Sequence, residues 1–168
     1  MKRIPLAKTV NSCTLFLMTH IGFYQVRDPM PSTTDKTLAH LLEKVCSGGH
    51  RVLVVCPNTQ RAERIDEMLW TYKEESFLPH GLESDGTHVE KHPILITTKP
   101  ENANGADILV MVSGAQGGAI ADYEKAIDIF EGHDNQVTKA RERWKLYKDA
   151  GFELSYFEHT GTGWQKKA

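Results

Sequence analysis

A cysteine and an arginine stand close together after the most apolar segment of the chain. Cys56 ends the run RVLVVC, and Arg61 follows within the next few residues. A thiolate and a guanidinium at the carboxyl end of a central strand would suit a phosphatase, because open α/β sheets place reacting groups there. However, only four residues separate the pair, too few for the phosphate cradle of such an enzyme, and Pro57 removes one N–H donor. We therefore interpret Cys56 as a buried structural thiol.

Two shorter patterns could hold a phosphate or a metal ion. The turn Ser113–Gly118 (SGAQGG) follows a strand-like run, but it has neither the GxGxxG spacing nor the Lys of a P-loop, so we interpret it as a tight turn. His88 and His92 have the spacing of two metal ligands on a helix, but Gly86 and Pro93 flank them and disfavour a helix. We expect no catalytic site, no bound metal and no cofactor.

The segment Val137–Phe152 (VTKARERWKLYKDAGF) is more informative. On a helix, Arg141, Lys145 and Lys148 fall on one stripe, and Trp144 lies beside them. Such a surface could pair with an acidic chain end that carries an apolar anchor, or with single-stranded nucleic acid through phosphates and bases. It could also be an ordinary solvated basic face. The spacing alone does not choose among these three interpretations.

Large apolar residues also fall within a stretch that has the composition of a loop. Phe77, Leu78 and Leu82 belong to LWTYKEESFLPHGL, where Pro79 and Gly81 disfavour regular structure. Loops rarely expose so many large apolar groups to water, so these side chains either pack beneath the loop or face a partner.

The elements that position these residues alternate between strand and helix. Strands are expected at 21–26, 51–56, 94–97, 108–112 and, at the sheet edge, 152–157. Helices are expected at 37–46, 59–72 (with Asn58 as N-cap), 119–130 and 134–150, and a long connection at 74–91. This order predicts a single α/β domain: a three-layer Rossmann-like fold with a mostly parallel sheet and helices on both faces.

Composition limits the class of protein. The 168 residues are 40% hydrophobic and 25% charged, which is typical of one globular domain. A formal net charge of −2 disfavours a general basic coat for duplex DNA. Three dispersed cysteines without a CxxC pair fit a reducing cytoplasm, and no apolar run approaches the roughly 20 residues that cross a bilayer.

The amino-terminal residues need separate treatment. A basic start followed by the apolar stretch 13–18 superficially resembles a signal peptide, but polar residues interrupt it and no small-residue cleavage site follows. We expect residues 1–20 to be a disordered extension, with Met18 as an alternative start of translation. The domain is then expected at 21–158, followed by a polar tail at 159–168.

Three blocks, in order, resemble the chi subunit family of bacterial DNA polymerase III. They are HRVLVVCP, DEMLWTYKEESFLPHGL and ARERWKLYKDAGFELSY, and the similarity extends over about residues 21–157. The resemblance implies a Rossmann-like fold without nucleotide chemistry, in a non-catalytic accessory subunit of DNA replication. It also implies two partners: the acidic, Phe-terminated C-terminal tail of the single-stranded-DNA-binding protein, and the psi subunit of the clamp loader.

The resemblance also implies site residues by position. The tail-binding residues would be Arg141, Trp144, Lys145 and Lys148, with Phe130 nearby in the preceding helix, and the psi-facing residue would be Phe77. Trp144 stands where a Tyr is familiar in the family, and Val137 stands where a further Lys can occur. The missing Lys would weaken the tail contact modestly, because a surface cation contributes less than about 1 kcal/mol. The alternative function is a direct single-stranded nucleic-acid-binding module that uses the same helix, against which the negative net charge counts.

Overall fold

An eight-stranded sheet organises the residues that the structure describes. The computed structural model describes residues 18–28, 30–73, 75, 77–86 and 88–168. Within them the strand order is β3-β4-β2-β5-β6-β1-β7-β8, and all neighbours are parallel except β7 and β8. The strands are β1 (His20–Val26), β2 (Val52–Val55), β3 (His80–Leu82), β4 (Ile94–Thr97), β5 (Ile108–Val112), β6 (Lys125–Glu131), β7 (Glu153–His159) and β8 (Trp164–Lys166).

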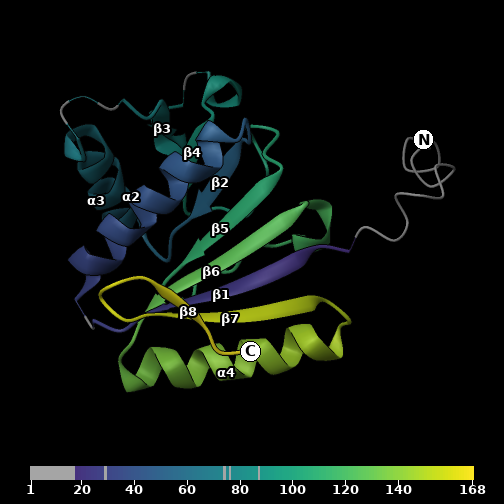
Figure 1. The fold of residues 1–168 in the computed structure, drawn as a ribbon. Helices are drawn as coiled ribbons and strands as arrows, with labels where there is room; N and C mark the ends of the chain where they lie inside the picture. The colour runs from purple at the N-terminus through teal and green to yellow at the C-terminus, as the bar shows by residue number, and fades with distance from the viewer. Residues whose placement is uncertain (1–17, 29, 74, 76, 87) are drawn as a thin grey trace, which may run out of the picture.

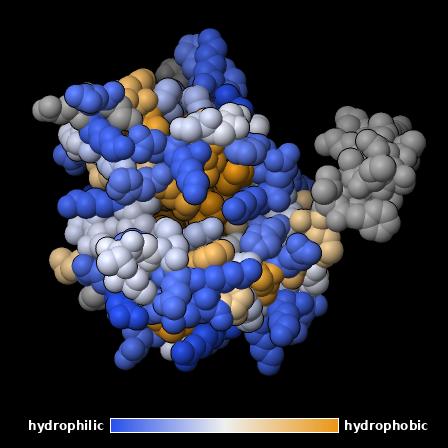
Figure 2. Space-filling model, viewed as in Figure 1, coloured by the Kyte–Doolittle hydropathy of each residue, from blue (hydrophilic) through white to orange (hydrophobic). Residues whose placement is uncertain are grey.

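Helices cover both faces of this sheet, as Figure 1 shows. α2 (Pro31–Ser47) and α3 (Thr59–Thr71) pack on one face, and α4 (Asp134–Asp149) packs on the other. Short 3-10 turns at Glu83–Asp85, Val89–Lys91 and Ile120–Asp122 complete the connections. Figure 2, from the same side, shows a largely hydrophilic surface with hydrophobic atoms exposed in a hollow near its centre. The predicted three-layer α/β fold is confirmed.

The central strands are buried on both faces. Every residue of β2 (VLVV), β4 (ILIT) and β5 (ILVMV) is buried, as expected for parallel strands between two layers of helices and loops. In β1 the side chains alternate, with Ile21 and Phe23 toward α4 and Val26 toward α2. Asn58 caps α3 as predicted, because its side-chain oxygen accepts a 2.8 Å hydrogen bond from the N–H of Arg61.

The helix predicted at 119–130 is wrong. Residues 120–122 form one 3-10 turn, and residues 125–131 form β6, which lies between β5 and β1. The apolar residues of KAIDIFE follow helical spacing only because Asp128 interrupts an otherwise continuous apolar run. The interruption hides a strand that is buried on both faces. Phe130 consequently lies in a strand and not in a helix.

The carboxyl-terminal residues extend the sheet. The strand expected at 152–157 exists as β7, but it is not the edge, because β8 pairs with it from within the expected polar tail. A strand of three exposed residues gives little sequence signal. At the other end, residues 1–17 of the expected extension lie outside the described residues, and His20 already begins β1.

Two further boundaries differ from the sequence prediction. α2 begins at residue 31 and not at 37, because the Asp28 carboxylate accepts hydrogen bonds from the N–H of Met30 and the hydroxyl of Thr33 and so organises an earlier first turn. The connection expected at 74–91 contains β3 and two 3-10 turns among its described residues, so it contributes an edge strand to the sheet.

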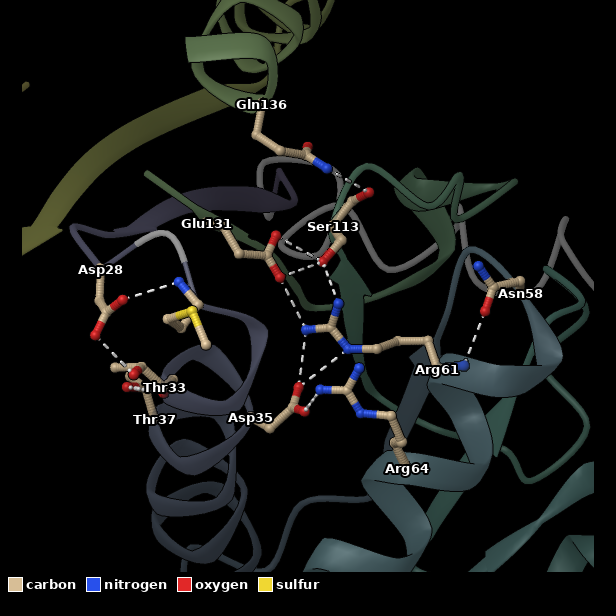
Figure 3. A network of polar contacts seen from close by, with 11 residues as sticks. Asp28, Thr33, Asp35, Thr37, Asn58, Arg61, Arg64, Ser113, Glu131 and Gln136 are labelled. Carbon is tan, nitrogen blue, oxygen red and sulfur yellow. Dashed lines mark hydrogen bonds and ion pairs between the residues drawn. The ribbon is translucent and has the colours of Figure 1, made fainter. Parts of the chain in front are cut away.

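A buried arginine joins both helices of one face to the sheet (Figure 3). Nη2 of Arg61 lies 2.8 Å from Asp35 of α2 and 3.0 Å from Glu131 at the end of β6, and Nη1 donates to Ser113 after β5. Ser113 in turn donates a 2.8 Å hydrogen bond to Glu131. The Arg61 side chain is only 9% exposed. Burial alone would lower its pKa, but the two carboxylates outweigh burial and raise it, so the cation is held charged.

We expect Arg61→Ala to lower the free energy of unfolding by about 3–5 kcal/mol, because the buried Glu131 would lose its counter-charge and the buried Asp35 would keep only the half-exposed Arg64. Arg64→Ala is the matched control, since that side chain contacts the same Asp35 at 3.3 Å but is 47% exposed. Its loss should cost less than about 1 kcal/mol. Urea unfolding followed by circular dichroism measures both. Equal losses in the two variants would contradict the structural role of Arg61.

Candidate partner-binding surfaces

The side of α4 that faces the sheet is fixed by close packing. Gly132 precedes the helix, and a Cβ there would lie 2.7 Å from the carbonyl oxygens of Val26 and Arg27, so only glycine fits. The inward-facing side chains then recur at helical spacing and pack on the second core cluster: Val137, Ala140, Trp144 and Tyr147. The opposite side of the helix is left to solvent.

A buried ion pair sets how α4 is rotated on the sheet. Arg143 binds the carboxylate of Asp128 in β6 in a bidentate manner, at 2.7 and 2.9 Å, and its guanidinium lies 5.8 Å from the centre of the Phe130 ring. Asp128 has no exposed side-chain surface. Burial raises its pKa, and Arg143 opposes that rise. The sequence analysis missed this pair. A single Asp within an apolar segment could have indicated it, because a buried carboxylate needs a cationic partner.

The basic stripe lies on the other flank of the helix. Arg141, Lys145 and Lys148 are exposed, and among the described residues none of them has a carboxylate within ion-pair distance. We call these three side chains the α4 basic stripe. The positive charge of Arg141 is close enough to Tyr156 of β7 to oppose the burial that raises the pKa of that phenol. The stripe therefore borders the junction of α4 with β7.

The two predicted aromatic residues of this site lie deeper than the stripe. Trp144 is half-buried, with its ring at 5.3 Å from Phe23 and 5.9 Å from Tyr156, both edge-on. Phe130 is fully buried beneath Arg143 and Tyr156, so it cannot meet a partner without rearrangement of the core. The structure thus groups Arg141, Lys145 and Lys148 at the surface with Trp144 at their border, and it separates Phe130 from them.

A second surface lies at the end of α3. Phe77 is 65% exposed and Trp70 is 58% exposed, with ring centres 5.6 Å apart, and the Trp70 ring also packs at 4.8 Å from His80. We call Trp70 and Phe77 the aromatic pair. Leu78 is buried and Leu82 is partly buried against the first core cluster, so the loop divides its apolar groups between core and solvent. The sequence analysis did not identify Trp70 as a surface residue. Its position outside the 62, 65, 69, 72 spacing of the buried side of α3 could have indicated that it is exposed.

The place where α/β sheets usually bind ligands is filled by the protein's own charges. Cys56 is 2% exposed, and burial raises the pKa of its thiol to about 12, so it is not a thiolate nucleophile at neutral pH. At the turn after β5, the Ser113 hydroxyl donates its hydrogen bond to the Glu131 carboxylate (Figure 3). That hydroxyl is therefore not free to bind a phosphate or another anionic ligand. The Arg61 guanidinium is likewise paired with Asp35 and Glu131 and is not free to bind an anion.

The histidines offer little for metal binding. His88 has a left-handed backbone, and a 3-10 turn separates it from His92, so the two are not on one helix face. Among the described residues, one group brings three potential ligand atoms within 4.8 Å of one another: His50, Asp107 and Glu124. Burial alone would raise the pKa of Asp107, but hydrogen bonds from His50 and the Arg51 N–H outweigh it and lower that pKa. The carboxylate is thus already satisfied.

No helix in the described ranges combines the length and the apolar character required to cross a bilayer.

Comparison with known proteins places this chain in one family. The family model described as "DNA polymerase III chi subunit, HolC" matches residues 18–155. A DNA polymerase III subunit chi from Escherichia coli K12 is 27% identical over 124 residues, which cover 74% of this chain and 84% of that protein. The proteins of the same name from Pseudomonas aeruginosa and Haemophilus influenzae are 22% and 26% identical, over 82% and 79% of this chain and 94% and 92% of their own lengths. Since the match spans most of the sequence and the observed fold is the one its motifs implied, this chain belongs to the DNA polymerase III chi subunit family.

Proposed function

We propose that this chain is a non-catalytic accessory subunit of the DNA polymerase III holoenzyme that bridges two partners during DNA replication. One partner is the acidic C-terminal tail of the single-stranded-DNA-binding protein, and the other is the psi subunit of the clamp loader. The observation that carries the proposal is the presence of two chemically different surfaces on opposite faces of one sheet. The α4 basic stripe lies on one face. The aromatic pair lies by the other, with Trp70 in the last turn of α3 and Phe77 in the connection that leads to β3.

The α4 basic stripe has the chemistry to bind an acidic chain end. Its three cations have no acidic partner among the described residues, so a carboxylate ligand would not have to displace an existing ion pair. Trp144 and Tyr156 supply an apolar surface beside Arg141, against which a terminal aromatic side chain could pack. Because exposed charges are screened by ions, the binding should weaken as salt increases.

The aromatic pair has the chemistry of a protein interface. Two large rings that touch each other and remain more than half exposed form an apolar patch that water solvates poorly. Trp is among the residues most often central to binding energy at interfaces. Trp70 is held at the carboxyl end of a packed helix and between the rings of Phe77 and His80, so it is pre-organised for a partner such as psi.

We expect Arg141→Ala to weaken binding of the acidic C-terminal peptide by about 2 kcal/mol, roughly 30-fold, because central arginines dominate such contacts. Isothermal titration calorimetry with that peptide measures the effect. Lys139→Ala is the matched control, since Lys139 is exposed on the same helix but lies outside the stripe. Trp144→Ala should also weaken binding, and its unfolding must be measured in parallel because the ring packs on Phe23. Unchanged affinity in Arg141→Ala would refute the assigned site.

We expect Phe77→Ala to leave peptide binding unchanged and to weaken association with psi by at least about tenfold, because an exposed ring at an interface centre would be lost. Co-purification of the two subunits, followed by analytical ultracentrifugation, measures the association. Met30→Ala is the control, since Met30 is another exposed apolar side chain, 57% accessible, away from the aromatic pair. Loss of both peptide and psi binding in Phe77→Ala would contradict two separate surfaces.

A further inference from the structure

A groove runs between α2 and the β7–β8 hairpin, on the face of the sheet opposite α4. Its volume is about 600 Å³. One wall is a stripe of α2 side chains at four-residue intervals, Lys36, His40 and Lys44, and the floor and other wall come from Tyr24, Phe157 and Trp164. The family resemblance assigns no role to this groove, and the groove contains no residue of the α4 basic stripe or of the aromatic pair.

The floor of the groove is built from aromatic rings in contact. Tyr24 and Phe157 stack with centres 4.9 Å apart, and Trp164 meets Tyr24 edge-on at the same distance while remaining 36% exposed. The Tyr24 ring lies over Gly22, where a Cβ would approach it to 2.6 Å. Glycine at that position therefore lets the ring lie against β1, and the groove is a shaped aromatic surface and not a chance gap.

The rim of the groove is positively charged. Lys36 and Lys44 have no ion-pair partner among the described residues, and Lys166 pairs in register with Phe157 and so faces the same side of the hairpin. None of the lining residues is acidic. Acids on or next to these segments have partners of their own: Glu43 binds Lys73 at 2.9 Å, and Asp28 accepts a hydrogen bond from Thr33.

We propose that this groove binds single-stranded nucleic acid. Lysines along one wall would contact successive phosphates, and the rings of Trp164, Tyr24 and Phe157 would contact bases, which is the combination that single-strand-binding grooves use. Nucleic acid fits better than an acidic peptide here because three adjoining rings exceed what one terminal aromatic residue needs, whereas successive bases use them all. The α4 basic stripe offers only the half-buried Trp144, so the groove is also a better strand site than that helix.

This site is separate from the proposed tail site and rests on different residues. The groove lies on the α2 face and the α4 basic stripe belongs to the opposite face, so one molecule could hold a strand and an acidic tail together. The two assignments can therefore fail independently.

The test is fluorescence anisotropy of a labelled oligothymidylate of about 15 nucleotides, titrated with the full-length protein at several salt concentrations. We expect saturable binding, weakened at least about tenfold in the double variant Lys36→Glu, Lys44→Glu, with a salt slope lower by about 1.4 because two phosphate contacts are lost. Lys145→Glu, Lys148→Glu makes the same charge change on the opposite face. It should leave oligonucleotide binding within about twofold and abolish binding of the acidic peptide.

The aromatic floor is tested separately from the charge. Trp164→Ala should weaken oligonucleotide binding with no change in salt slope, and Trp164→Phe should restore most of it, since a ring remains available for stacking. Absence of oligonucleotide binding at low salt would overturn the proposal, as would an equal loss in the two double variants. Loss of the peptide but not of the oligonucleotide in Lys36→Glu, Lys44→Glu would make the groove a peptide site. Peptide binding that survives Lys145→Glu, Lys148→Glu would refute the tail assignment alone.

Discussion

The ion network around Arg61 is the interaction on which the rest of the structure depends. One buried guanidinium joins α3 to Asp35 of α2 and to Glu131 of β6, and it reaches Ser113 beyond β5. These residues meet at the carboxyl ends of parallel strands, where related architectures bind their ligands. Because the charges neutralise one another there, the position that usually binds a ligand instead holds α2 and α3 to the sheet. The surfaces that we propose for partners therefore lie away from it.

The same principle divides the cations of α4. Arg143 has a buried carboxylate to bind, Asp128, and so it fixes the rotation of the helix on the sheet. With that rotation fixed, Arg141, Lys145 and Lys148 lie on the flank beside β7, where no carboxylate of the described part of the chain is within ion-pair distance. Arg143 thus positions the α4 basic stripe without being part of it. The basic residues of α4 look alike in the sequence, but they lie on two flanks of the helix with different roles.

The sequence predicted most of what depends on local patterns and little of what depends on long-range pairing. β2, α3 and its Asn58 cap were predictable, because continuous apolar runs and caps are local signals. β6 was mistaken for a helix because the reason that Asp128 can be buried, Arg143, lies 15 residues away. β8 was invisible because its stability comes from pairing with β7 and not from its own composition. For the same reason, the burial of Phe130 could not be deduced from spacing. The exposure of Trp70 could have been, because Trp70 falls outside the spacing of the buried side of α3.

The two proposed sites, the α4 basic stripe and the groove beside α2, lie on opposite faces of the sheet, which has a consequence for affinity. The sites share no side chain, so binding at one should change the other little through direct contact. Yet an acidic tail and the strand coated by the same protein are physically linked, so engagement of one raises the effective concentration of the other. Two individually weak, salt-sensitive contacts would then hold the subunit firmly on a coated strand, while either contact alone would release quickly. Two such sites on opposite faces would therefore suit a subunit that must both bind a coated strand and dissociate from it.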